Sequence, residues 1–226
     1  MTGGRPLVVA IDGPAGSGKS TVAAALAQRL SVPHVDTGAH YRAAALAVLR
    51  SGVNPADSGA CTAVLAGVRI QRRDGRTLLD GVDVEDEIRG PDVTGVVSTV
   101  SAHPEVRRAL LAGQRAEVTS AGAVVEGRDA GTVIVPDAAL KVWLTAAPEE
   151  RARRRASQRG RSDEATVARH LADLLRRDEA DAASMVPAPD VVEIDTSGRS
   201  VVSLVEELAD LATRAAAGAP RPVEER

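Results

Sequence analysis

The segment Gly13–Ser20 constrains this chain more than any other stretch. Its sequence, GPAGSGKS, fits the pattern G-x-x-x-x-G-K-[ST] and lies between an apolar run at 7–11 and a helix-forming stretch at 21–27. Closely spaced glycines let successive backbone N–H groups turn inward around phosphate oxygens, and the helix N-terminus adds partial positive charge. The segment therefore predicts a nucleoside triphosphate site made of a strand, a glycine loop (the P-loop) and a helix.

Two side chains of this loop have specific expected tasks. Lys19 is expected to reach the β- and γ-phosphates of ATP, and the Ser20 hydroxyl is expected to be a ligand of the Mg²⁺ that accompanies ATP. A chance glycine turn is the alternative interpretation, and the strand before the loop and the helix after it argue against one. The expected ATP-binding residues are Gly13, Pro14, Ala15, Gly16, Ser17, Gly18, Lys19, Ser20 and Thr21.

Composition narrows the class of protein. The 226 residues are 44% hydrophobic, which suits one domain with inserts. A net charge of −3 and an aromatic content of 1% argue against a dedicated nucleic-acid binder, which needs basic patches or stacking platforms. Cys61 has no second cysteine to pair with, and no stretch looks like a signal peptide or an apolar membrane span. We expect a cytoplasmic monomer without a structural metal, nucleic-acid partner or membrane.

The order of the predicted elements indicates the fold class. Strands alternate with helices, which favours an α/β protein with a parallel core sheet flanked by helices. The stretch 68–84 differs, because it alternates apolar and polar residues around Asp74-Gly75 and predicts a small antiparallel sheet. Two helical stretches between 148 and 184 predict a lid. The expected division is core at 5–36, 120–147 and 190–217, an insert at 37–119, lid and lid helices at 148–189, and a disordered tail at 218–226.

Two polar segments follow predicted strands of the core. They are DTGAHYR at 36–42 and EGRDAGT at 126–132. The carboxyl ends of parallel strands meet at one edge of a sheet, where ligands bind. Each segment contains an arginine among small polar side chains, which suits a second anionic substrate facing the γ-phosphate. Surface turns with solvated charges are the alternative.

Arginines are concentrated between 151 and 161. Helical spacing places Arg151, Arg154 and Arg155 on one face, which on a mobile lid could close over a polyphosphate and neutralise the transferring phosphoryl group. A nucleic-acid patch or a solvated helix face would have the same composition.

At this point the chain resembles a known family, the bacterial cytidylate kinases among the nucleoside monophosphate kinases. The resemblance implies ATP-dependent phosphorylation of CMP and dCMP, with Mg²⁺ bound together with ATP, and it identifies the insert at 37–119 as a monophosphate-binding domain. The EGRDxGT and DGxDVxxEIR patterns are specific to this family. The matching stretches between Ile11 and Ser197 are IDGPAGSGKST, DTGAHYRA, DGVDVEDEIRG, VSTVSAHPEVRRALLAGQR, VVEGRDAGTVIVPDA, LKVWLTAAPEERARRRASQ, RRDEADAAS and VVEIDTS.

The resemblance also implies roles for individual residues. Thr37, Arg107 and Asp129 match positions that recognise the cytosine ring. Positions that hold the CMP phosphate match Tyr41, Arg42 and Arg128, and positions near the sugar or the lid match Ser98, Arg177 and Asp181. The lid arginines match Arg154 and Arg155, so the residues expected to act on the transferring phosphoryl group are Lys19, Arg128, Arg154 and Arg155.

The chain departs from the family pattern at three places. His40 stands where an apolar residue is common, the lid is short around Gly160, and Ser184 stands where the family has a phosphate-binding arginine. These departures leave two alternatives open. One is a kinase for another small acceptor, such as UMP, and the other is a non-catalytic nucleotide-binding regulator. The chain has no Asn-Lys-x-Asp sequence of the kind that reads guanine.

The change Ser184→Arg tests whether this departure weakens the enzyme. We expect kcat/KM for CMP to stay unchanged, because Arg176 or Arg177, about two helical turns earlier, compensates for the missing arginine. A charge-assisted hydrogen bond is worth roughly 1.5 to 3 kcal/mol, so a gain of about 10- to 150-fold would contradict compensation. Weaker CMP binding in the variant would show that position 184 does not face the phosphate.

Overall fold

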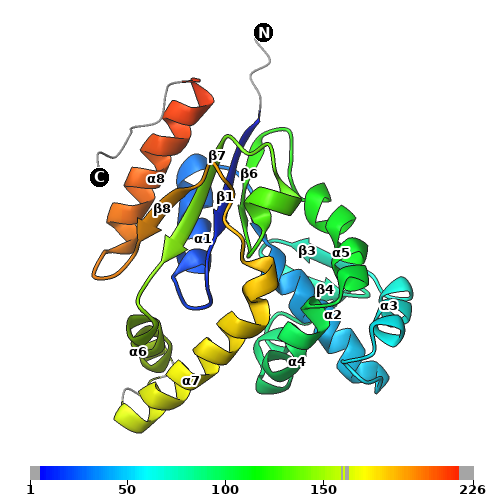
Figure 1. Cartoon of the computed structure of the whole chain (residues 1–226). Coiled ribbons are helices and arrows are strands. Elements are labelled where there is room, and N and C mark those ends of the chain that lie inside the picture. The colour runs from blue at the N-terminus through cyan, green and yellow to red at the C-terminus, as the bar shows by residue number, and fades with distance from the viewer. Residues whose placement is uncertain (1–5, 159, 161–162, 219–226) are drawn as a thin grey trace.

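The computed structural model describes residues 6–158, 160 and 163–218, and its centre is a parallel five-stranded sheet (Figure 1). The strand order is β2-β6-β1-β7-β8, so β1, which leads into the P-loop, lies in the middle. The predicted α/β class with a parallel core sheet is confirmed. The strands are β1 (Leu7–Asp12), β2 (His34–Asp36), β6 (Gly122–Glu126), β7 (Leu140–Thr145) and β8 (Val192–Asp195).

Alternating side chains of β1 supply both faces of this sheet. Val9 and Ile11 pack with α1 (Lys19–Leu30) and α8 (Val201–Ala216) on one face. Ala10 belongs to a second cluster on the other face, beneath the single π-helical turn η2 (Ala130–Ile134). Because both faces are covered, the central strands are continuous apolar runs rather than alternating ones.

The insert between β2 and β6 contains the predicted antiparallel sheet. Its strands are β3 (Ile70–Arg73), β4 (Arg76–Leu79) and β5 (Val82–Asp83). Asp74 and Gly75 both have positive φ, as the two-residue turn of a tight hairpin requires. The helices of the insert are α2 (Thr37–Ser51), α3 (Ser58–Ala66), the 3-10 turn η1 (Glu87–Arg89), α4 (Pro91–Ser101) and α5 (Pro104–Ala116).

Helix α3 did not follow from periodicity, because its nine residues are mostly small and show little separation of polar and apolar faces. The Asp57 side chain caps it by accepting from the backbone N–H of Ala60, at 2.9 Å. Cys61 is fully buried in the insert core, as its apolar neighbours predicted.

The predicted lid consists of two helices packed on each other, α6 (Pro148–Gln158) and α7 (Glu164–Asp181), followed by the 3-10 turn η3 (Ala182–Ser184). Figure 1 shows α7 running below the sheet from α6 toward α4. Residues 159, 161 and 162 at the lid junction lie outside the described residues, and so does the expected tail from 219 onward.

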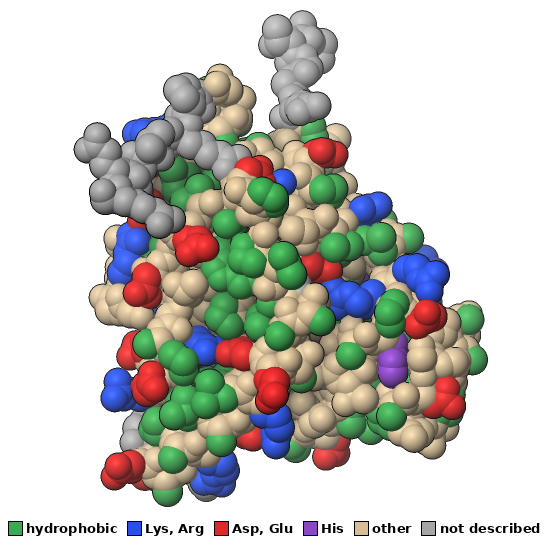
Figure 2. Space-filling view, in the orientation of Figure 1, with side chains coloured by type: hydrophobic (Ala, Val, Ile, Leu, Met, Phe, Trp, Pro, Cys, Tyr) green, Lys and Arg blue, Asp and Glu red, His purple; other side chains and the backbone are tan. Residues whose placement is uncertain are grey.

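The outer surface shows no large block of one charge in the view of Figure 2, where basic and acidic side chains are interspersed. Among the described helices, none is long and apolar enough to cross a membrane.

Gly122 provides a test of how the central strands meet. Its φ is +109°, and a Cβ at this position would overlap the carbonyl oxygen of Leu7 on β1. Gly122→Ala should lower the free energy of unfolding by about 2 to 5 kcal/mol, combining backbone strain with overpacking. Gly52→Ala is the matched control, since Gly52 has a φ of +71° but open space around it. It should cost only about 1 to 2 kcal/mol in denaturant unfolding. Equal losses would show that contact with Leu7 is unimportant.

Candidate active site

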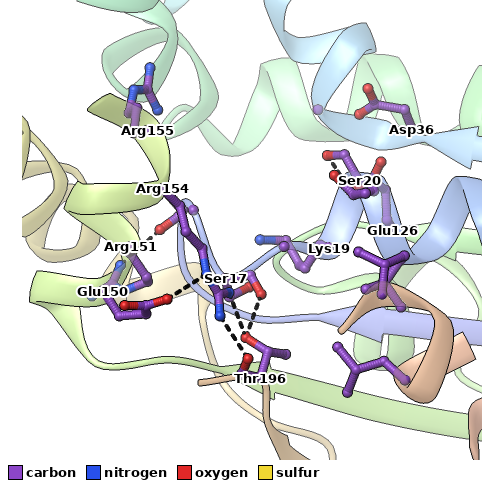
Figure 3. Close-up of a pocket in the computed structure, with 18 of the residues that line it drawn as sticks. Ser17, Lys19, Ser20, Asp36, Glu126, Glu150, Arg151, Arg154, Arg155 and Thr196 are labelled. Atoms are coloured by element: carbon purple, nitrogen blue, oxygen red, sulfur yellow. Dashed lines mark hydrogen bonds and ion pairs between the residues drawn. The ribbon is translucent and has the colours of Figure 1, made fainter. Parts of the chain in front are cut away.

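One large cleft opens at the carboxyl edge of the sheet, with a volume of about 890 Å³. The P-loop forms its floor, α6 closes one side, and the start of α2 and the end of β6 form the other (Figure 3). The structure brings most of the predicted phosphate-binding residues together here. The predicted residues that line the cleft are Ala15, Gly16, Ser17, Gly18, Lys19, Ser20, Thr21, Arg42, Arg128, Arg154, Arg155 and Arg177.

The P-loop has the conformation that a phosphate cradle needs. Gly13, Gly16 and Gly18 all have positive φ, which lets the backbone turn around a central space. The Lys19 amine is buried and donates to the carbonyl oxygen of Pro14 at 2.7 Å. Burial, followed by the nearby charge of Arg128, lowers the pKa of Lys19 well below its ordinary value. The charges of Glu126 and Asp12 act in the opposite direction but do not outweigh burial, and a phosphate in the loop would add further negative charge beside this amine.

Ser20 and Glu126 meet on the side of the loop away from α6 (Figure 3). The Ser20 hydroxyl donates to Glu126 Oε2 at 2.8 Å, and only 3% of Glu126 is exposed. The Thr37 hydroxyl donates to the backbone carbonyl of Glu126 at 2.7 Å and fixes the strand end. A hydroxyl and a carboxylate beside a phosphate cradle are the donor set that Mg²⁺ uses with nucleotides, so these residues fit the expected ion.

Asp12, the last residue of β1, holds the neighbouring loop in place. Its two carboxylate oxygens each accept at 2.8 Å, one from the backbone N–H of Ala130 and the other from that of Gly131. Burial raises the pKa of Asp12, although the two backbone donors act in the opposite direction. This carboxylate therefore sets the position of the segment that begins with Arg128 and Asp129.

Several arginines line the cleft close to one another. Burial and the charges of Arg177, Arg89 and Arg155 lower the pKa of Arg42 to about 10. The pKa of Arg177 is also lowered, first by burial and then by the charge of Arg128. Cations that depress one another in this way favour an anion between them. The cleft is therefore suited electrostatically to phosphate groups.

Asp36 is the main counter-charge on the insert side of the cleft. Burial by itself would raise its pKa, but Arg89 at 2.9 Å and Arg72 at 3.8 Å hold the pKa of Asp36 below its ordinary value. Asp36 also caps α2 by accepting from the backbone N–H of Ala39 at 3.0 Å.

A second cavity, of about 420 Å³, lies beside the insert and contains the predicted base-reading pair. Arg107 and Asp129 form an ion pair at its wall, and the Arg107 guanidinium lies 5.2 Å from the centre of the Tyr41 ring. Asp181 lines the same cavity and accepts from Nε of Arg128 at 3.1 Å. Arg128 therefore links this cavity to the large cleft.

Three predicted CMP-binding residues, Thr37, Tyr41 and Ser98, line neither cavity. Thr37 is buried, with its hydroxyl on Glu126 as described above. Tyr41 is 8% exposed and stacks on Arg107. Ser98 is half-buried on α4, and its backbone carbonyl accepts from Ala102.

The lid arginines are engaged differently from one another. Arg151 is 4% exposed and donates to the carbonyl of Ala15 at 2.9 Å and to Asp178 at 2.7 Å, so it joins the P-loop to both lid helices rather than presenting a free charge. Arg154 donates to the hydroxyl of Thr196 at 2.9 Å and to its carbonyl at 2.7 Å. Of the three arginines predicted to share a face of the lid helix, Arg151 anchors the helix, and Arg154 and Arg155 line the cleft.

Sequence reasoning missed Thr196 and Arg89. The Thr196 hydroxyl also donates to the carbonyl of Ser17, so this residue connects β8, the lid and the P-loop. Thr196 follows the last strand and lies in the matching stretch VVEIDTS, and Arg89 lies in the DGxDVxxEIR pattern, but neither residue was given a role of its own.

Arg176 and Arg177, which were expected to compensate for the arginine missing at position 184, lie in different places. Arg177 lines the cleft, and its buried Nε has no hydrogen-bond partner among the described residues. The Arg176 side chain is 76% exposed and pairs with Asp173 on the outside of α7. Of the two, only Arg177 is in a position to take the place of the missing arginine. The side chain of Ser184 is not among those that the structure describes.

Comparisons with known proteins find one family over most of the chain. The family model described as cytidylate kinase matches residues 9–214. A cytidylate kinase of Symbiobacterium thermophilum is 47% identical over 92% of this chain and 97% of its own. Cytidylate kinases of Corynebacterium glutamicum and Mycolicibacterium paratuberculosis are 48% and 46% identical, each over 91% of this chain and 94% of their own.

Proposed function

The chain belongs to the cytidylate kinase family, and from that premise we propose that it transfers the γ-phosphoryl group of ATP to CMP and dCMP, with ADP and CDP or dCDP as products. The observation that carries this proposal is the pair of cavities joined by Arg128. A phosphate cradle lines one of them, and a carboxylate–guanidinium pair suited to a polar base edge lines the other.

Positioning and charge neutralisation account for the chemistry. The phosphate oxygen of CMP is already ionised near neutral pH, so no general base is needed. Lys19 would hold the β- and γ-phosphates of ATP, while Arg42, Arg128 and Arg177 would orient the acceptor phosphate for in-line attack. Arg154 and Arg155 on the lid would offset charge that spreads over the transferring group. Closure of the lid would exclude water, which keeps ATP from being hydrolysed.

Ser20 and Glu126 would hold the Mg²⁺ that accompanies ATP. When bound, this ion neutralises charge on the β- and γ-phosphates. The Ser20 hydroxyl donates a hydrogen bond to Glu126, which leaves its oxygen lone pairs directed elsewhere and available for a cation.

The two alternatives are less well supported. A non-catalytic regulator would not need arginines from the core, the insert and the lid to converge on one cleft. An acceptor such as UMP would differ from CMP at the edge that Arg107 and Asp129 face. A coupled ADP-release assay across the nucleoside monophosphates tests both, and we expect CMP and dCMP to be the preferred acceptors.

We further propose a cytoplasmic monomer that acts without nucleic acid or a membrane. The support is that one chain supplies the residues of both cavities and that its net charge is −3.

Lys19→Ala tests the assignment of the P-loop. The fold should be retained, because the amine faces the cradle rather than a hydrophobic core. We expect kcat to fall about 10²-fold or more, as on removal of one preorganised donor. Lys141→Ala is the control, since Lys141 pairs with Asp190 away from the cleft. Activity of Lys19→Ala within a few-fold of wild type would overturn the assignment.

Asp129→Ala tests the assignment of the base-reading pair. Arg107 would lose its ionic partner, and KM for CMP should rise about 10- to 150-fold, the equivalent of one charge-assisted hydrogen bond. KM for ATP should change far less. Asp173→Ala, which removes a partner of the exposed Arg176, serves as the control. An equal rise in both KM values would place Asp129 at the metal instead.

A further inference from the structure

His34 lies directly behind the Ser20–Glu126 pair and has no part in the mechanism above. Its Nε2 is 2.9 Å from Glu126 Oε1, while Ser20 occupies Oε2 of the same carboxylate. We infer that His34 is a positioning residue that fixes the Glu126 carboxylate toward Ser20 and thereby toward the nucleotide-bound Mg²⁺. This inference rests on the proposed function, since it assigns a task within the same site.

The register of the sheet explains why these side chains meet. In the parallel pairing of β2 with β6, His34 lies opposite Val124, and Asp36 lies opposite Glu126. Residues two apart on a strand share a face, so His34 and Glu126 leave the same face of the sheet as diagonal neighbours. Strand β2 is at the edge of the sheet, and its position brings the imidazole to the carboxylate from the side opposite to the P-loop.

The donor and acceptor roles follow from chemistry. An ionised carboxylate only accepts, so Nε2 of His34 must carry the proton in this hydrogen bond. The Ser20 hydroxyl likewise donates to the other oxygen. Both carboxylate oxygens therefore have a donor, and the Ser20 oxygen keeps its lone pairs for a cation.

A competing cation makes this positioning necessary. Glu126 is close enough to Lys19 for its charge to raise the pKa of that amine, although burial acts more strongly in the opposite direction. With Oε1 accepting from His34, the carboxylate is held in the orientation in which Oε2 accepts from Ser20. His34 supplies this donor from strand β2. The side chain of His34 is 22% exposed, whereas that of Glu126 is 4% exposed, so the donor reaches the carboxylate from the edge of the site.

A purely structural role is the competing explanation. The same hydrogen bond also joins an edge strand to its neighbour, and its loss could loosen β2 without any effect specific to the metal. Such loosening would disturb ATP binding whether or not Mg²⁺ is present. The two explanations therefore differ in the Mg²⁺ dependence of nucleotide affinity.

The experiment measures ATP affinity by calorimetry on the full chain, once with excess Mg²⁺ and once with EDTA, in the absence of CMP. His34→Phe keeps a planar ring but removes the donor, and His34→Gln keeps an N–H near the position of Nε2. We expect His34→Phe to weaken ATP binding about 10- to 100-fold with Mg²⁺, as loss of an outer-shell partner does. Its affinity in EDTA should match wild type, and His34→Gln should stay within about 3-fold of wild type in both conditions.

Three results would overturn the inference. They are wild-type Mg²⁺-dependent affinity in His34→Phe, equal weakening with and without Mg²⁺, and a failure of His34→Gln to restore the Mg²⁺ effect. If His34→Phe does not fold, His34→Val replaces it, because valine suits a strand and also lacks the donor. The assay uses no acceptor, so wild type that binds MgATP but phosphorylates no CMP would contradict the proposed function and leave the test of His34 intact.

Discussion

A concentration of buried positive charge is the constraint on which the rest of this structure depends. Lys19, Arg42, Arg128 and Arg177 lie around one cleft. Burial and neighbouring positive charges lower the pKa values of Lys19, Arg42 and Arg177. Such a cluster is costly without an anion. Lys19, Arg42 and Arg177 extend from three different helices, α1, α2 and α7, and Arg128 follows β6. Asp36 and Glu126 supply negative charge within the cleft, and Asp181 accepts from Arg128.

Helix α6 of the predicted lid is joined to the P-loop by a side-chain hydrogen bond to a backbone carbonyl. Arg151 donates to the carbonyl of Ala15, and Thr196 donates to the carbonyl of Ser17 while it accepts from Arg154. A phosphate that reshapes the P-loop would thus act on α6 through Arg151 and on the end of β8 through Thr196. These hydrogen bonds tie Arg151 and Arg154 of α6 to the P-loop, Arg151 directly and Arg154 through Thr196.

Arg128 has a comparable linking role between the two cavities. It lines the large cleft, and its Nε donates to Asp181 of the second cavity. Asp12 fixes the segment that follows by accepting from Ala130 and Gly131. A carboxylate at the end of β1, next to the P-loop, therefore determines where the acceptor-side arginine stands relative to ATP.

The sequence alone determined the phosphate cradle, the parallel class and the hairpin of the insert, because each depends on local signals: glycines before a helix, apolar runs, and Asp74-Gly75 between alternating segments. The resemblance to the cytidylate kinase family added Arg107 and Asp129 to the predicted site, and in the structure these two residues form an ion pair. Tertiary structure alone decided that Arg151 is an anchor, that Arg177 rather than Arg176 faces the cleft, and that His34 supports Glu126. These outcomes depend on side-chain direction and on contacts between residues far apart in the chain, and helical or strand spacing does not encode either.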